Sequence, residues 1–146
     1  MRDDKGKSAH LCKRYPTVFA LLLRGLGIPS LIGIPSLNRI FSSYLGRYEM
    51  SDLDLNDSYP NIIIVSGCFM LFKMAILREV GGFSNRYFLY FEDFEISIKT
   101  SQVSKIVFSP KITHFGGKTA RKGFKQIFFF IRSAITFFNN NGWRWF

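Results

Sequence analysis

The sequence predicts a single α/β domain. The chain has 146 residues, which is enough for one ordinary domain and too few for two. Short apolar runs typical of strands alternate with stretches of helical periodicity, so both element types are expected in one chain. Hydrophobic residues make up 47% of the sequence and Phe occurs 17 times, so aromatic side chains must fill much of the core.

One helix and two irregular segments are expected in the first part of the chain. Proline suits a first helical turn and glycine a helix end, so a short helix is expected between Pro16 and Gly25. Residues 27–37 repeat the motif Gly-Ile-Pro-Ser-Leu, and their glycines and prolines predict an irregular apolar connector. Residues 46–60 are polar and acidic and predict a solvated loop.

The middle of the chain predicts two strands on either side of a glycine. The β-branched run 62–65 and the apolar run 69–72 are typical of buried strands. Gly67 between them predicts a bulge or the close approach of a ligand. Cys68 lies in the same stretch, and we expect it to be a small buried hydrophobe.

Three helices and two more strands complete the prediction. A short helix is expected over 73–80, where a pair of glycines ends it, and another over 92–100. Short strands are expected at 106–108 and 111–113. A long helix, apolar on almost every side, is expected over 120–138.

The charge of the chain is uneven. There are 20 Lys and Arg residues against 10 Asp and Glu, which gives a net charge of +10. Nine Lys and Arg residues follow Glu95, and no Asp or Glu does. Such a surface attracts phosphates, lipid head groups or nucleic acid, or only keeps the protein soluble. Because no recognition motif of a nucleic-acid-binding family is present, we expect no nucleic-acid partner.

Location and membrane contact are predicted from the two ends of the chain. The N-terminus lacks the apolar core of a signal peptide, so a cytoplasmic location is expected. The last helix and residues 142–146 combine aromatic and basic side chains, which is typical of an interfacial membrane anchor and equally of a core helix with an aromatic tail. Peripheral contact with the inner face of a membrane is therefore a second expectation.

Two groups of residues are candidates for chemistry. Glu92, Asp93 and Glu95 would open a helix, where the macrodipole favours carboxylates and the ionised form that a general base needs; an ordinary acidic first turn has the same pattern. His114, after a predicted strand, could bind a divalent metal or a phosphate, or be an ordinary histidine.

Four short stretches occur in a set order along the chain: Ser66–Leu71, Glu79–Phe83, Phe88–Glu95 and His114–Gly117. Together they resemble the C-terminal half of family-two glycosyltransferases, especially the bacterial rhamnosyltransferase-like members. That family shows a G-A/C-x-M-L strand, a V-G-G-F turn, an F-x-Y-x-E-D-x-D/E-L stretch and an H-x-G-G closure. Lys13–Thr17 also resembles its R-R-F-P-T stretch.

The resemblance implies a GT-A fold, in which a mixed sheet lies between helices. Residues 1–146 would be its acceptor-side portion, with 120–146 as a helical, aromatic and basic extension. The activity implied is inverting transfer of a sugar from a nucleoside-diphosphate sugar to a glycan or lipid-linked acceptor. The family's N-terminal nucleotide-binding half does not precede Met1, so we expect a fragment that needs a missing half or self-associates.

The resemblance also implies the roles of individual residues. Asp93 would be the general base, with Glu92 beside it, and His114 would lie by the diphosphate and its Mg²⁺ or Mn²⁺. The residues expected to line the substrate site are Gly67, Cys68, Glu95, Gly116 and Gly117. Apart from the resemblance, the cationic side chains of Lys118 and Arg121 are expected to meet phosphate oxygens as point charges. The alternative function is a catalytically inactive, basic membrane-surface or interaction module derived from the same fold.

Overall fold

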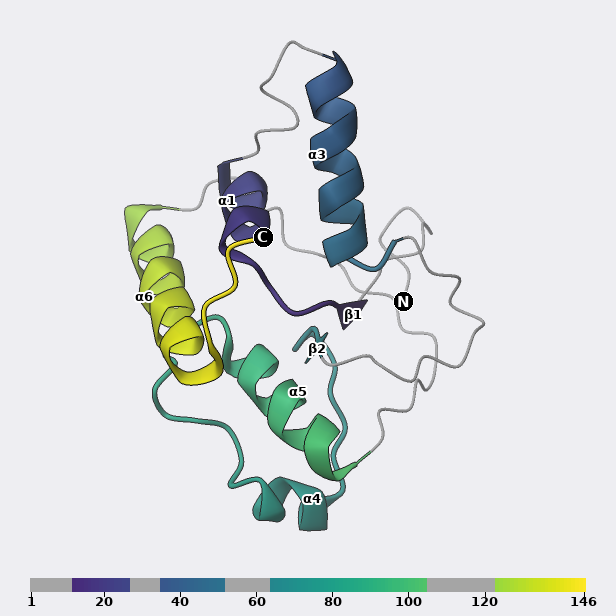
Figure 1. The fold of residues 1–146 in the computed structure, drawn as a ribbon. Helices are drawn as coiled ribbons and strands as arrows, with labels where there is room; N and C mark the ends of the chain where they lie inside the picture. Colours follow the sequence, from purple (N-terminus) through teal and green to yellow (C-terminus); the bar gives the residue numbers. More distant parts are fainter. Residues whose placement is uncertain (1–11, 27–34, 52–63, 105–122) are drawn as a thin grey trace.

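The computed structural model describes residues 12–26, 35–51, 64–104 and 123–146 (Figure 1). This part of the chain is mostly helical. In chain order its elements are β1 (Cys12–Lys13), α1 (Val18–Leu26), α3 (Pro35–Tyr48), β2 (Ile64–Val65), α4 (Met74–Glu79), α5 (Glu92–Val103) and α6 (Phe124–Asn141).

The prediction of an α/β domain built on a GT-A mixed sheet is wrong. The described residues form a single two-stranded antiparallel sheet, in which Cys12 pairs with Val65 and Lys13 with Ile64. The run 69–72 is an irregular loop rather than a strand. Its apolar character alone does not make a strand, because no neighbouring strand in the described part of the chain supplies the backbone partners. The strands expected at 106–108 and 111–113 lie outside the described residues.

Four of the predicted helices are confirmed, as α1, α4, α5 and α6. The side chain of Thr17 begins α1, since its Oγ1 accepts a hydrogen bond from the Ala20 N–H at 3.1 Å. Helix α3 was not predicted, and it overlaps the ends of both segments expected to be irregular. It begins with Pro35, a residue that suits the first helical position.

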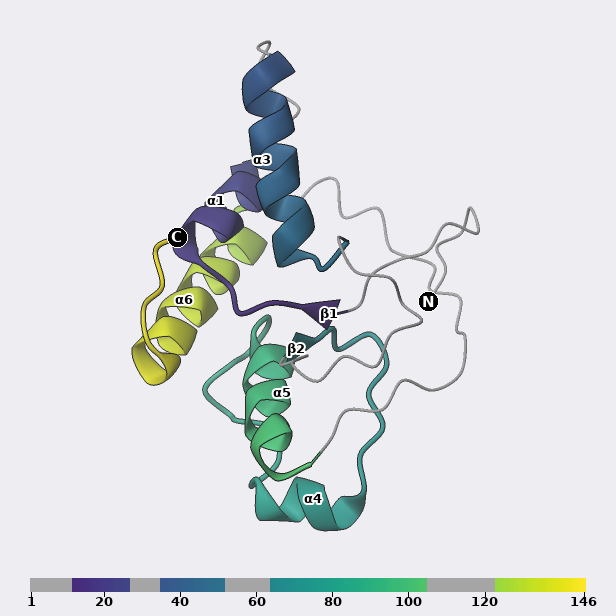
Figure 2. The same ribbon diagram turned by 45° about the vertical axis from the view of Figure 1, so that its right-hand side comes forward.

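The elements surround a core of aromatic side chains. Helices α1 and α3 contact each other at one end of the molecule, β1 and β2 lie near the middle, and α4 lies at the other end beyond α5 (Figures 1 and 2). Phe137 of α6 is fully buried, and its ring centroid lies 5.3 Å from that of Phe91 and 5.6 Å from that of Tyr15. These contacts hold α6 against the start of α5 and the segment before α1.

The C-terminal tail folds back onto the start of α1. Gly142 has φ 94°, a left-handed conformation that favours glycine and turns the chain at the end of α6. The N–H groups of Val18 and Phe19 then donate to the carbonyls of Arg144 and Trp145 at 2.8 and 3.2 Å. The tail thereby satisfies backbone donors that a helix leaves open in its first turn. None of the helices in the described ranges combines the length and apolarity that crossing a bilayer requires.

Candidate functional site

The start of α5 is preceded by a strained turn. Tyr90 and Phe91 have φ values of 69° and 66°, a left-handed conformation that is unfavourable for residues other than glycine. Phe91 is only 3% exposed, and its ring lies 5.4 Å from Phe130 and 5.3 Å from Phe137 of α6. Aromatic burial therefore holds the turn that delivers Glu92 to the first position of the helix.

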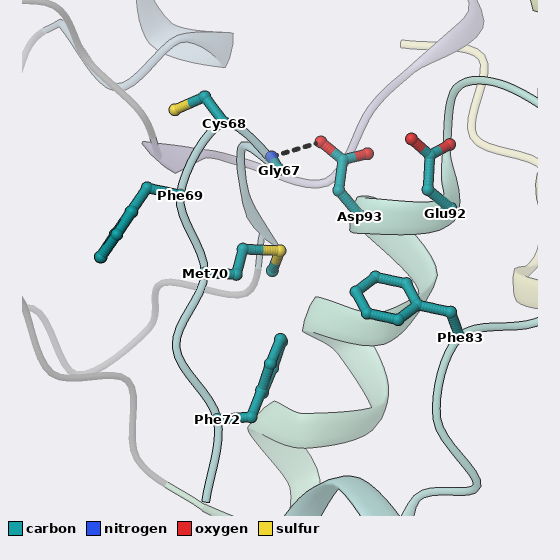
Figure 3. A pocket seen from close by; sticks show the side chains of 8 residues that line it. All are labelled: Gly67, Cys68, Phe69, Met70, Phe72, Phe83, Glu92 and Asp93. Atoms are coloured by element: carbon teal, nitrogen blue, oxygen red, sulfur yellow. Dashed lines mark hydrogen bonds between the residues drawn. The ribbon is translucent and has the colours of Figure 1, made fainter.

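A close approach between the loop after β2 and the first turn of α5 fixes the carboxylate of Asp93. The Gly67 N–H donates to Asp93 Oδ2 at 2.8 Å (Figure 3). The Phe94 N–H donates to Oδ1 at 3.0 Å. A Cβ atom at position 67 would lie 3.0 Å from the Cβ of Asp93. Only glycine therefore lets the chain pass so near this carboxylate without displacing it.

Ser97 connects β2 to α5 one turn after Asp93. Its Oγ accepts a hydrogen bond from the Val65 N–H at 3.1 Å and donates to the Asp93 carbonyl at 2.6 Å. The side chain is 1% exposed, so both bonds are shielded from water. The loop from Val65 to Gly67 is thus held at two points along α5. This role is not visible in the sequence, because a serine within a helix does not indicate which strand it will contact.

An open pocket of about 450 Å³ lies beside Asp93. One side of it is acidic and the other apolar. Figure 3 shows the side chains of Met70, Phe72 and Phe83 pointing toward one another on the apolar side, with the Phe72 and Phe83 rings edge to face at 6.1 Å. The residues that line the pocket are Gly67, Cys68, Phe69, Met70, Phe72, Phe83, Glu92 and Asp93.

Glu92 contributes the second carboxylate of the pocket. Its Oε2 atom is buried and has no hydrogen-bond partner among the described residues. Desolvated carboxylate oxygens normally have a donor, so this oxygen is an unsatisfied acceptor beside the pocket. Adjacent carboxylates and an aromatic wall suit a ligand that has both hydroxyl groups and apolar faces.

The side chain of Glu95 lies outside the pocket that Glu92 and Asp93 line. It is 7% exposed, and its Oε1 forms an ion pair with Lys99 at 2.9 Å. Burial raises the pKa of Glu95, but the Tyr87 hydroxyl and the Lys99 ammonium outweigh burial and hold the pKa below its ordinary value. Glu95, expected to bind substrate, does not line the pocket, and its contacts are those of a structural ion pair.

Lys13 brings a cation from β1 to the start of α5. Its Nζ lies 5.2 Å from the centroid of the Phe94 ring. Burial, and then the positive charge of Arg24, lowers the pKa of Lys13, while the negative charges of Asp93 and Glu49 act in the opposite direction. In the sequence, Lys13 stands out only as part of a motif, because its place near α5 depends on the pairing of β1 with a strand some fifty residues away.

The structure brings together four of the predicted site residues: Gly67, Cys68, Glu92 and Asp93. The expectation that Cys68 is buried is wrong: it is exposed, because the apolar run that contains it forms a loop at the rim of the pocket. Glu95 is described but lies outside the pocket, and the other five predicted site residues lie outside the described residues; they are His114, Gly116, Gly117, Lys118 and Arg121.

The described residues do not by themselves form a site for Mg²⁺ or Mn²⁺. No three His, Cys, Asp or Glu side chains in these ranges converge in a way that could hold a metal ion. Glu92 and Asp93 supply carboxylates at one pocket, but the described part of the chain adds no third ligand to them.

No protein-family model, curated protein or solved structure matches the chain. The function must therefore be inferred from the chemistry of the pocket and from the motifs that form it.

Proposed function

We propose that this pocket binds the hydroxyl-bearing end of a glycan or lipid-linked acceptor, and that Asp93 is the general base of a glycosyl transfer. The donor is a nucleoside-diphosphate sugar, and the configuration at the anomeric carbon is inverted. The observation that carries the proposal is the carboxylate of Asp93, held by the Gly67 N–H at 2.8 Å on the rim of an open pocket. The order of the glycosyltransferase-like motifs supports the same function.

The fixed carboxylate of Asp93 suits proton transfer from an alcohol. Each of its oxygens accepts one backbone N–H, and each keeps a second acceptor site for the acceptor hydroxyl. As the hydroxyl proton moves to Asp93, the acceptor oxygen forms a bond to the anomeric carbon of the donor. The bond from that carbon to the diphosphate breaks, and its electron pair leaves with the phosphate oxygen. Asp93 then releases the proton to water.

The rest of the pocket orients the acceptor. The carboxylate of Glu92, which lines the same pocket, accepts a hydrogen bond from a neighbouring hydroxyl of the same molecule. Met70, Phe72 and Phe83 provide an apolar wall for the C–H face of a sugar ring or for the first carbons of a lipid carrier. Holding the hydroxyl at a fixed base in this way lowers the entropic part of the barrier.

The test is transfer by the purified chain with a panel of nucleoside-diphosphate sugars, oligosaccharide and lipid-linked acceptors, each with and without Mn²⁺. Products are detected by mass spectrometry. Asp93→Asn should lower the transfer rate by about 100-fold or more, because it removes the base without changing the size of the side chain. Glu79→Gln, an equivalent change at an exposed carboxylate of α4, should leave the rate unchanged. Full turnover by Asp93→Asn, or no product from the wild-type chain with any pair, would contradict the proposal.

A further inference from the structure

Helix α6 has an apolar face that is open to solvent. Its members are spaced as residues on one side of a helix, at i, i+3, i+4, i+7 and i+11. We call this set the apolar stripe; its residues and exposed fractions are Phe124 (93%), Ile127 (44%), Phe128 (61%), Ile131 (52%) and Ile135 (45%). The opposite side of α6 carries the buried Ser133 and Phe137, so α6 contributes to the core with one face and leaves the stripe uncovered.

The C-terminal tail extends the apolar stripe with tryptophan. The Trp143 ring stacks on Phe138 with centroids 5.2 Å apart, and its Nε1–H donates to Asn139 Oδ1 at 2.9 Å. Phe138 and Asn139 lie on the two flanks of the line that the stripe follows, so Trp143 covers its end. Trp145 stacks on Trp143 with centroids 5.6 Å apart; Trp143 is 45% exposed and Trp145 is 59% exposed.

Positive charge lies along one edge of the apolar stripe. Lys125 and Arg132 are both exposed and follow members of the stripe by one residue, which places them about 100° around the helix on the same side. Neither α6 nor the tail contains Asp or Glu. A stripe of exposed Phe and Ile, tryptophans at one end and a basic edge is the composition of a helix that lies in a membrane interface.

We propose that the apolar stripe and the Trp143–Trp145 tail dock on an anionic lipid surface, with α6 parallel to the membrane plane. Charge complementarity selects this occupant. An anionic head-group layer neutralises Lys125 and Arg132, whereas a second copy of the stripe would bring no carboxylate to meet them. This inference concerns a surface separate from the pocket at Asp93 and does not rest on glycosyl transfer.

The experiment uses the whole chain with vesicles of phosphatidylcholine alone and of phosphatidylcholine mixed with phosphatidylglycerol. Because the chain has two tryptophans and both lie in the tail, its intrinsic fluorescence reports contact directly. Flotation with the mixed vesicles and a blue shift of the emission are expected, and added salt should weaken both. Absence of binding, or binding equal for the two lipid compositions, would overturn the proposal.

Two matched pairs of variants locate the contact. Ile131→Glu should weaken binding about tenfold or more, because it removes an inserted side chain and adds a negative charge. Ile40→Glu makes the same change at an exposed isoleucine of α3 and should bind as the wild type does. Equal loss in both variants would overturn the assignment to α6.

The second pair tests the basic edge. Lys125→Gln with Arg132→Gln should weaken binding to the mixed vesicles, while Lys73→Gln with Arg78→Gln, which removes two exposed charges near α4, should not. Sedimentation of each protein without lipid measures its oligomeric state. A wild-type dimer that Ile131→Glu converts to a monomer, with vesicle binding unaffected by that change, would show that a second copy covers the stripe.

Discussion

Truncation of Phe137 is the sharpest test of the aromatic core. Its side chain is 0% exposed, and its ring has four aromatic neighbours with centroid separations between 5.3 and 6.0 Å. Those neighbours come from the segment before α1, the strained turn, α5 and α6 itself. Phe137→Ala would leave a cavity at the point where these parts of the chain meet.

The loss of stability in Phe137→Ala follows from the size of the cavity. Removing a fully buried phenylalanine ring lowers the free energy of unfolding by about 3–5 kcal/mol, of which the edge and tilted ring contacts supply a part. The total free energy of unfolding of a small domain is about 5–15 kcal/mol, so the variant should be either largely unfolded or clearly less stable than the wild type. With a urea dependence of about 2 kcal/mol per molar, the unfolding midpoint should fall by roughly 2 M.

Urea unfolding followed by far-ultraviolet circular dichroism measures this shift. The control is Phe124→Ala, the same change on the same helix at a ring that is 93% exposed, which should alter stability by less than about 0.5 kcal/mol. Equal midpoints for Phe137→Ala and Phe124→Ala would refute the assignment of Phe137 to the centre of the core.

Three more predictions concern Gly67 at the pocket, the ion pair of Glu95 and the two cysteines. Gly67→Ala should displace the Asp93 carboxylate by a few tenths of an ångström and slow transfer about tenfold, as measured by initial rates; an unchanged rate would show that the close approach does not matter. The folded-state pKa of Glu95 lies below its ordinary 4.5, so its ionised form stabilises the fold above about pH 4.5, and this contribution is lost as the pH falls through the lowered pKa. The difference in urea midpoint between wild type and Glu95→Gln should therefore shrink in acid, and a constant difference would contradict it. Burial raises the pKa of Cys12 to about 11, so a thiol reagent should modify the exposed Cys68 in the native protein and Cys12 only after unfolding; equal rates would contradict this placement.

Helices were the predictable part of this fold. Periodicity and end signals located α1, α4, α5 and α6, because these features are local to each segment. Helix α3 also has a helical pattern in its sequence: Leu37, Phe41, Tyr44 and Tyr48 recur at helical spacing after Pro35. The repeated glycines and prolines that overlap its start are typical of an irregular connector, so residues 27–37 were predicted to be irregular.

The sheet could not be predicted in the same way. An apolar run forms a strand only where another segment supplies backbone partners, and the sequence does not reveal which segments meet. Residues 69–72 have the composition of a strand and form a loop at the pocket, whereas Cys12 and Lys13 pair with β2 although nothing local marks them as a strand.

The sequence predicted several residues of the candidate site, but not the residues that hold them in place. Gly67 and Asp93 were selected separately, as a glycine inside an apolar run and a carboxylate at a helix start, and they meet through one hydrogen bond. Ser97 and Lys13 reach the same region by tertiary contacts that leave no local pattern. Glu95 belongs to the same acidic cluster as Asp93, yet its position along the turn directs it to Lys99 instead.

The most direct measurement is a crystal structure of the chain with a bound acceptor analogue. A hydroxyl of the analogue should lie within about 2.6–3.2 Å of a carboxylate oxygen of Asp93, directly or through one water, with the sugar ring or lipid against Phe72 and Phe83. An analogue bound away from this pocket, or one whose hydroxyls leave Asp93 without a contact, would contradict the role of Asp93 as the base that activates the acceptor.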